Sequence, residues 1–297
     1  MITCGAIAGD MFGSEIEFND GIKKEYRFDN DNFGKYSDDT IMTLAIKYVL
    51  SNRILTNGRY IYFPDPKDDN EFRKRIVISL KTLGQKYPYA GYGATFYNWL
   101  FLNTDQPYNS FGNGSAMRVS SVGWKYNSIE EVKHVAQLTA EVTHNHPEGI
   151  KGAQAIALCI LAGRYEIKKE RLKSYIEKEF GYNLNTPLSE VKYDIDYCKS
   201  NKLNPISCQY TVPQAIIAFL ESNSFEDCIF KAVNIGGDTD TIGAMAGSIA
   251  EAYYGVPDYI EKIVRDKLPE ELLFIYDYDV EFNTKIFSLT DEEIINM

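Results

Sequence analysis

Two short stretches of this 297-residue chain combine carboxylate and hydroxyl side chains directly ahead of apolar segments. The serine-aspartate stretch is Ser37-Asp38-Asp39-Thr40, and the aspartate-threonine stretch, Asp238-Thr239-Asp240-Thr241, follows a glycine pair. Carboxylates that are brought together repel one another unless a cation neutralises them. Hard divalent cations prefer carboxylate, hydroxyl and water oxygens. The two stretches therefore predict one shared site for Mg²⁺, Mn²⁺ or Ca²⁺.

Helix capping is the alternative interpretation of either stretch taken alone. Asp, Ser and Thr are the preferred N-cap residues, and acidic side chains in a first helical turn favour the helix dipole. A cap needs only one acceptor, so the presence of both stretches favours the metal site. Zinc is the weaker alternative, because the chain has three histidines and its five cysteines form no Cys-x-x-Cys pair.

Glycine spacing indicates how these stretches are brought together. Gly5, Gly9 and Gly13 would line one face of a helix, and Gly243 and Gly247 repeat the spacing just after the aspartate-threonine stretch. Since glycine lets another backbone approach closely, we expect the two helices to pack against each other. The contact would carry three more acidic residues toward that stretch, namely Asp10, Glu15 and Glu17.

A glycine-rich turn, residues 111–119, enters a predicted helix and could present backbone N–H groups to phosphate oxygens. Taken alone, such a turn is more often a connector, and we interpret Arg118 as a structural ion-pair partner. His144 and His146 lie at a junction between helices, where their spacing points the rings apart and does not favour zinc. We expect one of them to line a ligand pocket, with capping and core roles also open.

Helical periodicity dominates the chain, so we predict an all-α protein in which residues 1–297 form one domain. The active groups would lie on helix starts and loops. A capping box at Ser128 and a proline at position 147 mark two of the starts. Residues 58–70 read as a loop, 182–209 as an irregular stretch, and 277–287 as a possible strand pair. The predicted helices are 1–13, 39–51, 71–85, 128–143, 154–162, 171–180, 212–222 and 225–233, and residues 94–102 form a short apolar segment.

Composition excludes several classes of protein. A net charge of −11 with no long basic run argues against a broad nucleic-acid surface. The longest apolar run, residues 153–163, is shorter than the about 20 residues that a membrane span needs. No signal peptide is evident, and an odd number of cysteines without a framework fits a reducing compartment. We expect a cytoplasmic monomer with no membrane contact.

The chain resembles the ADP-ribosylglycohydrolase family, which is typified by dinitrogenase reductase-activating glycohydrolase. The resemblance covers most of the chain and rests on five motifs that occur in the family's order. They are residues 9–17 (GDMFGSEIE), 37–40 (SDDT), 112–118 (GNGSAMR), 143–144 (TH) and 236–241 (GGDTDT).

This resemblance implies a single orthogonal helical bundle that holds two Mg²⁺ or Mn²⁺ ions and hydrolyses the bond between ADP-ribose and a protein side chain or another acceptor. ADP-ribose would be the product, and the substrate an ADP-ribosylated protein or small molecule. Glu17 matches the family's catalytic acidic residue. The implied metal ligands are Ser37, Asp38, Asp39, Asp238, Asp240 and Thr241. The implied ADP-ribose contacts are Ser110, Phe111, Gly112, Asn113, Gly114 and His144.

Two alternatives stay open beside this reading. A metal-free glycosidase could use a pair of carboxylates such as Glu17 and Asp39. A non-catalytic ADP-ribose-binding protein of the same fold is the other, although intact acidic stretches favour an enzyme. The irregular stretch 182–209 matches no family motif, so we expect that substrate choice depends in part on it.

Overall fold

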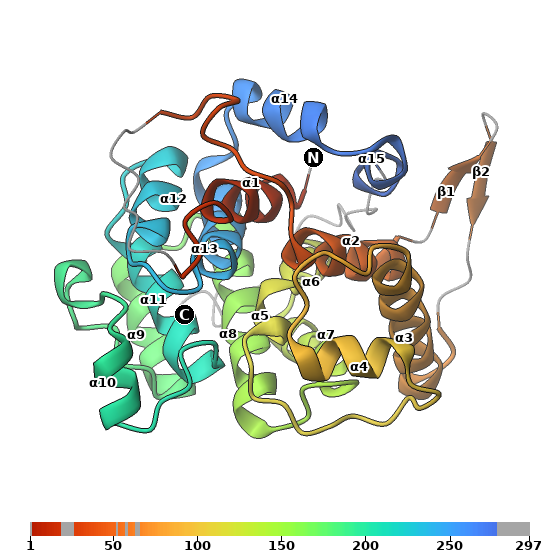
Figure 1. Ribbon diagram of the computed structural model, residues 1–297, viewed down its shortest axis with the longest axis horizontal. Coiled ribbons are helices and arrows are strands. Elements are labelled where there is room, and N and C mark those ends of the chain that lie inside the picture. Colours follow the sequence, from red (N-terminus) through yellow and green to blue (C-terminus); the bar gives the residue numbers. More distant parts are fainter. Residues whose placement is uncertain (1, 19–26, 52, 57–58, 63–65, 278–297) are drawn as a thin grey trace.

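The computed structural model describes residues 2–18, 27–51, 53–56, 59–62 and 66–277, and its described part is built almost wholly of helices (Figure 1). The all-α prediction is therefore confirmed. A 3-10 turn at Leu188–Glu190 lies between α9 and α10. The helices are α1 Cys4–Gly13, α2 Asp38–Leu50, α3 Asp69–Lys86, α4 Ala94–Phe101, α5 Gly114–Met117, α6 Ser120–Lys125, α7 Ile129–Glu141, α8 Pro147–Arg164, α9 Lys169–Phe180, α10 Ile195–Ser200, α11 Cys208–Leu220, α12 Phe225–Val233, α13 Thr239–Tyr254, α14 Asp258–Lys267 and α15 Glu270–Tyr276.

Helices α1 and α13 pack backbone against backbone, as the glycine spacing predicted. A Cβ added at Gly9 would lie 2.0 Å from the carbonyl oxygen of Gly243, and one at Gly5 would lie 2.1 Å from that of Gly247. No side chain fits in so little space, so the contact requires glycine. Glu251 of α13 also accepts a 3.0 Å hydrogen bond from the amide of Gly5 at the start of α1. The helices are antiparallel, so the end of α1 meets the start of α13.

Helix α8 forms part of the centre of the hydrophobic core. Every apolar side chain from position 153 to 162 is fully buried, which explains why this run shows no polar face in the sequence. Helices α5, α6, α7, α11 and α13 all pack against it. None of the helices in the described ranges is both long and apolar enough to cross a membrane.

Two helix starts follow the predicted capping chemistry. Ser128 Oγ accepts a 3.2 Å hydrogen bond from the amide of Glu131, at the start of α7. Pro147 occupies the first turn of α8, where its missing N–H costs nothing. His146 precedes it as the N-cap, and its Nδ1 lies 3.1 Å from the amide of Glu148. One member of the His-x-His pair is thus a capping residue.

A short antiparallel hairpin lies between α2 and α3 in the chain and corrects one prediction. Strand β1, Arg53–Thr56, pairs with β2, Arg59–Tyr62, whereas the sequence reading placed residues 58–70 in a loop. The strands are rich in β-branched and aromatic residues, and the Asn-Gly dipeptide at 57–58 is a strong hairpin signal. Pro64 and Pro66, which favour a loop, lie after β2 and do not interrupt the strands.

The C-terminal part contains two helices that the sequence reading did not identify. Helix α14 buries Ile260, Ile263 and Val264, a spacing that is typical of an amphipathic helix. Helix α15 follows and ends at Tyr276, with Asp277 as its C-cap. Residues 278–287 of the expected strand pair lie outside the described residues.

Candidate active site

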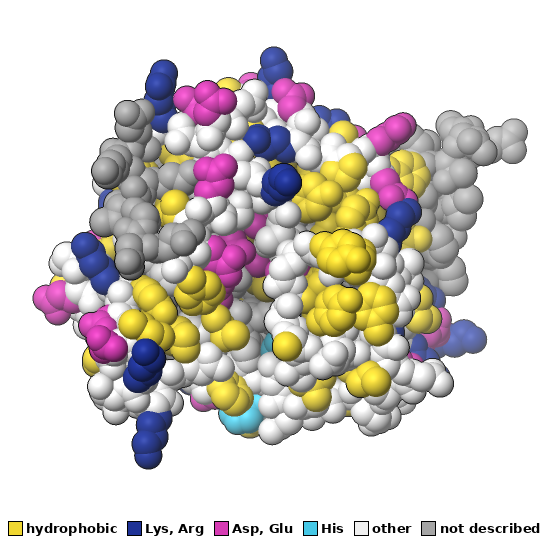
Figure 2. Space-filling model, in the orientation of Figure 1, with side chains coloured by type: hydrophobic (Ala, Val, Ile, Leu, Met, Phe, Trp, Pro, Cys, Tyr) yellow, Lys and Arg dark blue, Asp and Glu magenta, His cyan; other side chains and the backbone are white. Residues whose placement is uncertain are grey.

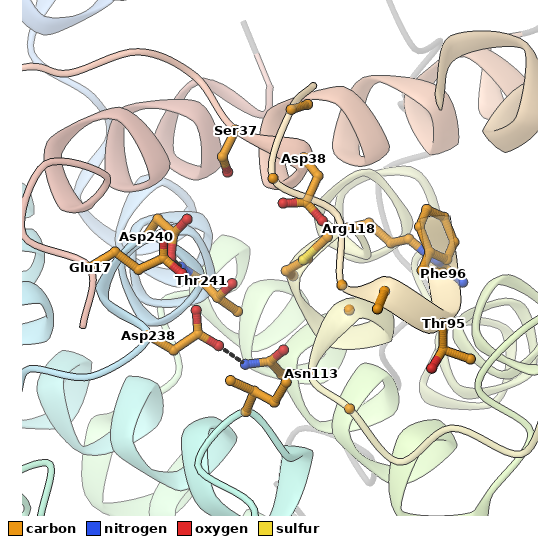
Figure 3. Close-up of a pocket in the computed structure, with 18 of the residues that line it drawn as sticks. Glu17, Ser37, Asp38, Thr95, Phe96, Asn113, Arg118, Asp238, Asp240 and Thr241 are labelled. Atoms are coloured by element: carbon orange, nitrogen blue, oxygen red, sulfur yellow. Dashed lines mark hydrogen bonds between the residues drawn. The ribbon is translucent and has the colours of Figure 1, made fainter. Parts of the chain in front are cut away.

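The two oxygen-rich stretches begin two helices whose N-termini face each other (Figure 3). The serine-aspartate stretch opens α2, and the aspartate-threonine stretch opens α13. Thr241 Oγ1 donates a 3.0 Å hydrogen bond to Asp39 Oδ2, across 202 positions of sequence. Both stretches therefore belong to one site, as their shared chemistry predicted.

Three carboxylates come closest together at this site. Oxygens of Glu17, Asp238 and Asp240 all lie within 4.8 Å of one another. Figure 3 shows Glu17 directed toward Asp240 from the segment that follows α1. Helix α1 ends at Gly13, so both Glu15 and Glu17 lie beyond it. The chain turns beyond α1 and brings Glu17 alongside α13.

Asp10 is a site residue whose role the sequence reading understated. It is fully buried, and its Oδ2 accepts hydrogen bonds from the amide of Ser37 at 2.9 Å and from the amide and hydroxyl of Thr40 at 3.1 and 2.5 Å. These three hydrogen bonds to Asp10 therefore fix the orientation of the serine-aspartate stretch. In the sequence, Asp10 directly follows Gly9, the middle glycine of the face that meets α13.

The capping alternative holds for one stretch and fails for the other. Ser37 is the N-cap of α2, and its Oγ accepts a 3.2 Å hydrogen bond from the amide of Asp39. Asp238 occupies the N-cap position of α13 but makes no side-chain hydrogen bond to its own helix. Its Oδ2 instead accepts a 2.6 Å hydrogen bond from Asn113 Nδ2. The carboxylate of Asp238 therefore binds the glycine-rich loop across the cleft and does not cap its own helix.

Electrostatics at the site favour a bound cation. Burial, followed by repulsion from Asp240, raises the pKa of Asp38, Asp39 and Asp238 well above the usual carboxyl range. The same two causes raise the pKa of Glu17 to about 7. Asp39 Oδ1 is buried and accepts no hydrogen bond from the described residues. A cluster of this kind lacks positive charge, and a divalent cation would supply it.

A cleft of about 1000 Å³ contains the site. Every residue predicted for the site lines this cleft except Asp39, which is buried behind the lining. Figure 2 shows acidic side chains in a hollow near the middle of this face, with hydrophobic side chains on either side. The sequence reading missed several lining residues because they carry no motif. They include Tyr36, Tyr89, Asn204 and Ile206.

The glycine-rich loop forms the opposite wall of the cleft. Gly114 lies beside His144, so that a Cβ there would be 3.1 Å from His144 Nε2. His144 Nδ1 lies 2.7 Å from Thr143 Oγ1. Burial and the positive charge of Arg118 lower the pKa of His144 well below its usual value, so the ring is neutral. His144 thus lines the cleft.

Arg118 differs from the sequence interpretation. Its Nη2 donates to the carbonyl oxygen of Thr139 at 2.8 Å and to Thr143 Oγ1 at 2.9 Å. In the described structure no carboxylate forms an ion pair with it, so the ion-pair interpretation is wrong. The guanidinium is buried under α7, where a carbonyl at the end of that helix and a hydroxyl take the place of an acidic partner.

A comparison with known families agrees with this geometry. The model for the ADP-ribosylglycohydrolase family matches residues 3–291. The chain belongs to the ADP-ribosylglycohydrolase family. Membership supports an ADP-ribosyl hydrolase activity and is consistent with an acidic site that can hold a metal.

Individual relatives of this chain are distant in sequence. An uncharacterized protein of Archaeoglobus fulgidus is 30% identical over 54% of this chain, which spans 55% of that protein. ADP-ribosylhydrolase ARH3 of Gallus gallus is 28% identical, with 74% of this chain and 70% of that protein covered. ADP-ribosyl-[dinitrogen reductase] glycohydrolase of Rhodospirillum rubrum is 28% identical, with coverages of 86% and 84%.

A solved structure shows the same fold. It is described as an ADP-ribosylglycohydrolase-related protein complex and is 21% identical to this chain, with a TM-score of 0.55. The match covers 90% of this chain and 98% of that one. At this identity the likeness concerns the arrangement of the helices alone.

Proposed function

We propose that this protein is a metal-dependent hydrolase that cleaves the glycosidic bond between ADP-ribose and a modified protein side chain or another acceptor. One observation carries the proposal: two hydrogen bonds join three distant segments around one cleft. Thr241 reaches Asp39, and Asn113 reaches Asp238, at 3.0 and 2.6 Å. A cation site and a loop suited to phosphate therefore adjoin each other.

The donor set fits two hard divalent cations, Mg²⁺ or Mn²⁺. The predicted ligands offer carboxylate and hydroxyl oxygens and no sulfur, which is the set that these ions select. Asp39 Oδ1 and Asp10 Oδ1 are buried without hydrogen-bond partners among the described residues, and the raised pKa values show how little positive charge the protein itself provides. The proposed ligands are Ser37, Asp38, Asp39, Asp238, Asp240 and Thr241.

Glu17 is the proposed proton-transfer group. Bound cations would supply the positive charge that orients the ribose hydroxyls and makes a water molecule more acidic. Glu17 would take a proton from the attacking water, and that proton would pass to the acceptor as its bond to the anomeric carbon breaks. In the metal-free site burial is the largest cause that raises the pKa of Glu17, and burial would persist with cations bound, which favours a group that both accepts and returns a proton.

The glycine-rich wall is the proposed binding site for the ADP-ribose portion. Gly112 and Gly114 carry no side chain into the cleft, where an added Cβ would lie 3.3 Å from Ser110 Oγ and 3.1 Å from His144 Nε2 respectively, so phosphate oxygens could come close to the backbone of this loop. Neutral His144 can offer Nε2 as an acceptor or a donor according to its tautomer, and Phe111 presents an exposed ring at the cleft. Ser110 and Asn113 complete the set of proposed contacts.

Turnover of defined ADP-ribosylated substrates tests the proposal. Arginine-linked, serine-linked and nucleic-acid-linked ADP-ribose, together with a small ADP-ribosylated molecule, would each be incubated with protein in Mg²⁺, in Mn²⁺ and in EDTA. We expect at least one substrate to release ADP-ribose with metal and to stop releasing it in EDTA. Activity that persists in EDTA would support the carboxylate-only glycosidase, whereas tight ADP-ribose binding without cleavage of any substrate would support a binding protein.

A further inference from the structure

Tyr193 belongs to the irregular stretch 182–209, which matches no motif of the family. Its ring covers the turn that leads into Asp238: a Cβ added at Gly237 would lie 2.7 Å from Tyr193 Cδ2. The amide of Tyr193 donates a 2.9 Å hydrogen bond to the carbonyl oxygen of Ile235. Gly237 has a positive φ of 76° and no side chain that could pack against its neighbours. The packing contact on this turn therefore comes from the ring of Tyr193.

The same ring contacts the residue that follows Glu17. The rings of Phe18 and Tyr193 meet edge to face, with centroids 5.9 Å apart and an interplanar angle of 76°. Phe18 has a φ of 48°, a left-handed conformation that is unfavourable for a residue with a bulky side chain. Its amide nevertheless donates a 2.8 Å hydrogen bond to the carbonyl oxygen of Gly237. A favourable aromatic contact offsets part of the cost of this conformation.

We propose that Tyr193 is a positioning residue. Its ring holds Phe18 against Gly237 and thereby places the carboxylate of Glu17 next to Asp238 and Asp240. The inference rests on the proposed role of Glu17 as the proton-transfer group. A displacement of about 1 Å at a catalytic group can lower a rate roughly 100-fold, so a contact outside the reacting atoms can control the chemical step.

The geometry also separates this effect from ADP-ribose binding. Tyr193 contacts the acidic wall of the cleft, whereas the other end of the same stretch contacts the glycine-rich wall. There, the amide of Asn113 donates a 3.0 Å hydrogen bond to the carbonyl oxygen of Ile206. Removing the ring of Tyr193 leaves this second connection in place. The affinity for free ADP-ribose should therefore survive a change at Tyr193.

Three variants test the inference. Tyr193→Ala removes the ring, and Tyr193→Phe keeps the ring and removes only the hydroxyl. Tyr197→Ala is the matched control, because Tyr197 lies four positions along the same stretch with 54% of its surface exposed. Three quantities would be measured on the full chain with Mg²⁺: single-turnover release of ADP-ribose, the dissociation constant of ADP-ribose, and hydrogen exchange of the Phe18 amide.

We expect Tyr193→Ala to lower the single-turnover rate roughly 10- to 100-fold, with an unchanged dissociation constant and faster exchange of the Phe18 amide. Tyr193→Phe and Tyr197→Ala should behave as wild type. Unchanged exchange at Phe18 in Tyr193→Ala overturns the inference whether or not the protein is active. A wild-type rate in Tyr193→Ala overturns it too, while the proposed function stands. If wild type cleaves nothing, the proposed function fails, and the exchange measurement still decides whether Tyr193 holds the Phe18 segment.

Discussion

The side-chain amide of Asn113 donates a 2.6 Å hydrogen bond to Asp238, although 125 positions separate the two residues. Both side chains are buried, so the bond is shielded from water. It joins the glycine-rich loop to the aspartate-threonine stretch and holds the two walls of the cleft at one separation. The same bond lowers the pKa of Asp238, although burial and Asp240 raise it by more.

Asn113→Ala should weaken ADP-ribose binding. The substitution leaves a buried oxygen of Asp238 without its donor and loosens the loop, so we expect affinity to fall roughly 10- to 100-fold. Titration calorimetry with free ADP-ribose would measure the loss. Asn223→Ala, on an exposed turn before α12, is the control and should bind as wild type. Wild-type affinity in Asn113→Ala would mean that the loop is only a connector.

Replacing Asp39 or Asp240 by Ala should abolish turnover and weaken metal binding. Each variant removes a carboxylate from the proposed cation site, and we expect Mn²⁺ affinity to fall by about tenfold or more. Calorimetric titration with Mn²⁺ is the measurement. Asp258→Ala changes the charge equally at the exposed start of α14 and should leave the affinity unchanged. Unaltered metal affinity in both site variants would rule out a site shared by the two stretches.

Stability of the metal-free protein should fall as the pH rises. Asp10 and Glu17 have pKa values of about 7 in the fold, above the ordinary carboxyl value of about 4. Between these limits the folded protein binds more protons than the unfolded chain, so the free energy of unfolding decreases with increasing pH. Thermal melts in EDTA from about pH 5 to pH 8 should therefore show a falling Tm.

Added Mg²⁺ should reverse that trend near neutral pH, because cations compete with protons for the carboxylates. At a free concentration of about 100 times its dissociation constant, a ligand at one site stabilises the fold by about 2.7 kcal/mol. The gain should be larger at the high end of the pH range than at the low end. A melting temperature that responds to neither EDTA nor Mg²⁺ would contradict the metal site.

Glu17→Gln should separate hydrolase from binding protein. The amide keeps the size of the side chain but cannot transfer a proton, a change that usually costs about 100- to 10,000-fold in rate. Single-turnover release of ADP-ribose should collapse while ADP-ribose and metal binding persist. Glu15→Gln, two positions earlier and exposed, should be nearly silent. Equal rates in wild type and Glu17→Gln would exclude Glu17 as the catalytic group.

Gly9→Ala should destabilise the fold more than any change at an unconstrained glycine. The new Cβ would lie 2.0 Å from the carbonyl oxygen of Gly243, and neither helix can move without disturbing the site at their junction. We expect a loss of about 1–3 kcal/mol or more in the free energy of unfolding, measured by urea denaturation. Gly93→Ala is the control, because no atom lies within 4 Å of its added Cβ. Equal stability of the two variants would refute the close packing of α1 on α13.

Some features of the protein follow from the sequence by itself. Helix periodicity, capping residues and glycine spacing act over a few positions, and they predicted most helices and the contact between α1 and α13. Donor chemistry is equally local: the side chains of Ser37-Asp38-Asp39 and Asp238-Thr239-Asp240 restrict the cations that they can bind wherever the chain folds. The Asn-Gly dipeptide at 57–58, which favours a hairpin, is equally local.

Other features depend on distances between segments that no local pattern specifies. The end of α1 at Gly13 and the turn that follows it decided that the carboxylate of Glu17 lies within 4.8 Å of those of Asp238 and Asp240. The packing of α1 against α2 decided that Asp10 binds Ser37 and Thr40. Burial decided that Arg118 bonds a carbonyl and a hydroxyl instead of a carboxylate. Tyr193 became relevant only because packing laid its ring on Gly237. A hydrogen bond or ring contact changes over a fraction of an ångström, and packing across the whole core sets distances at that scale.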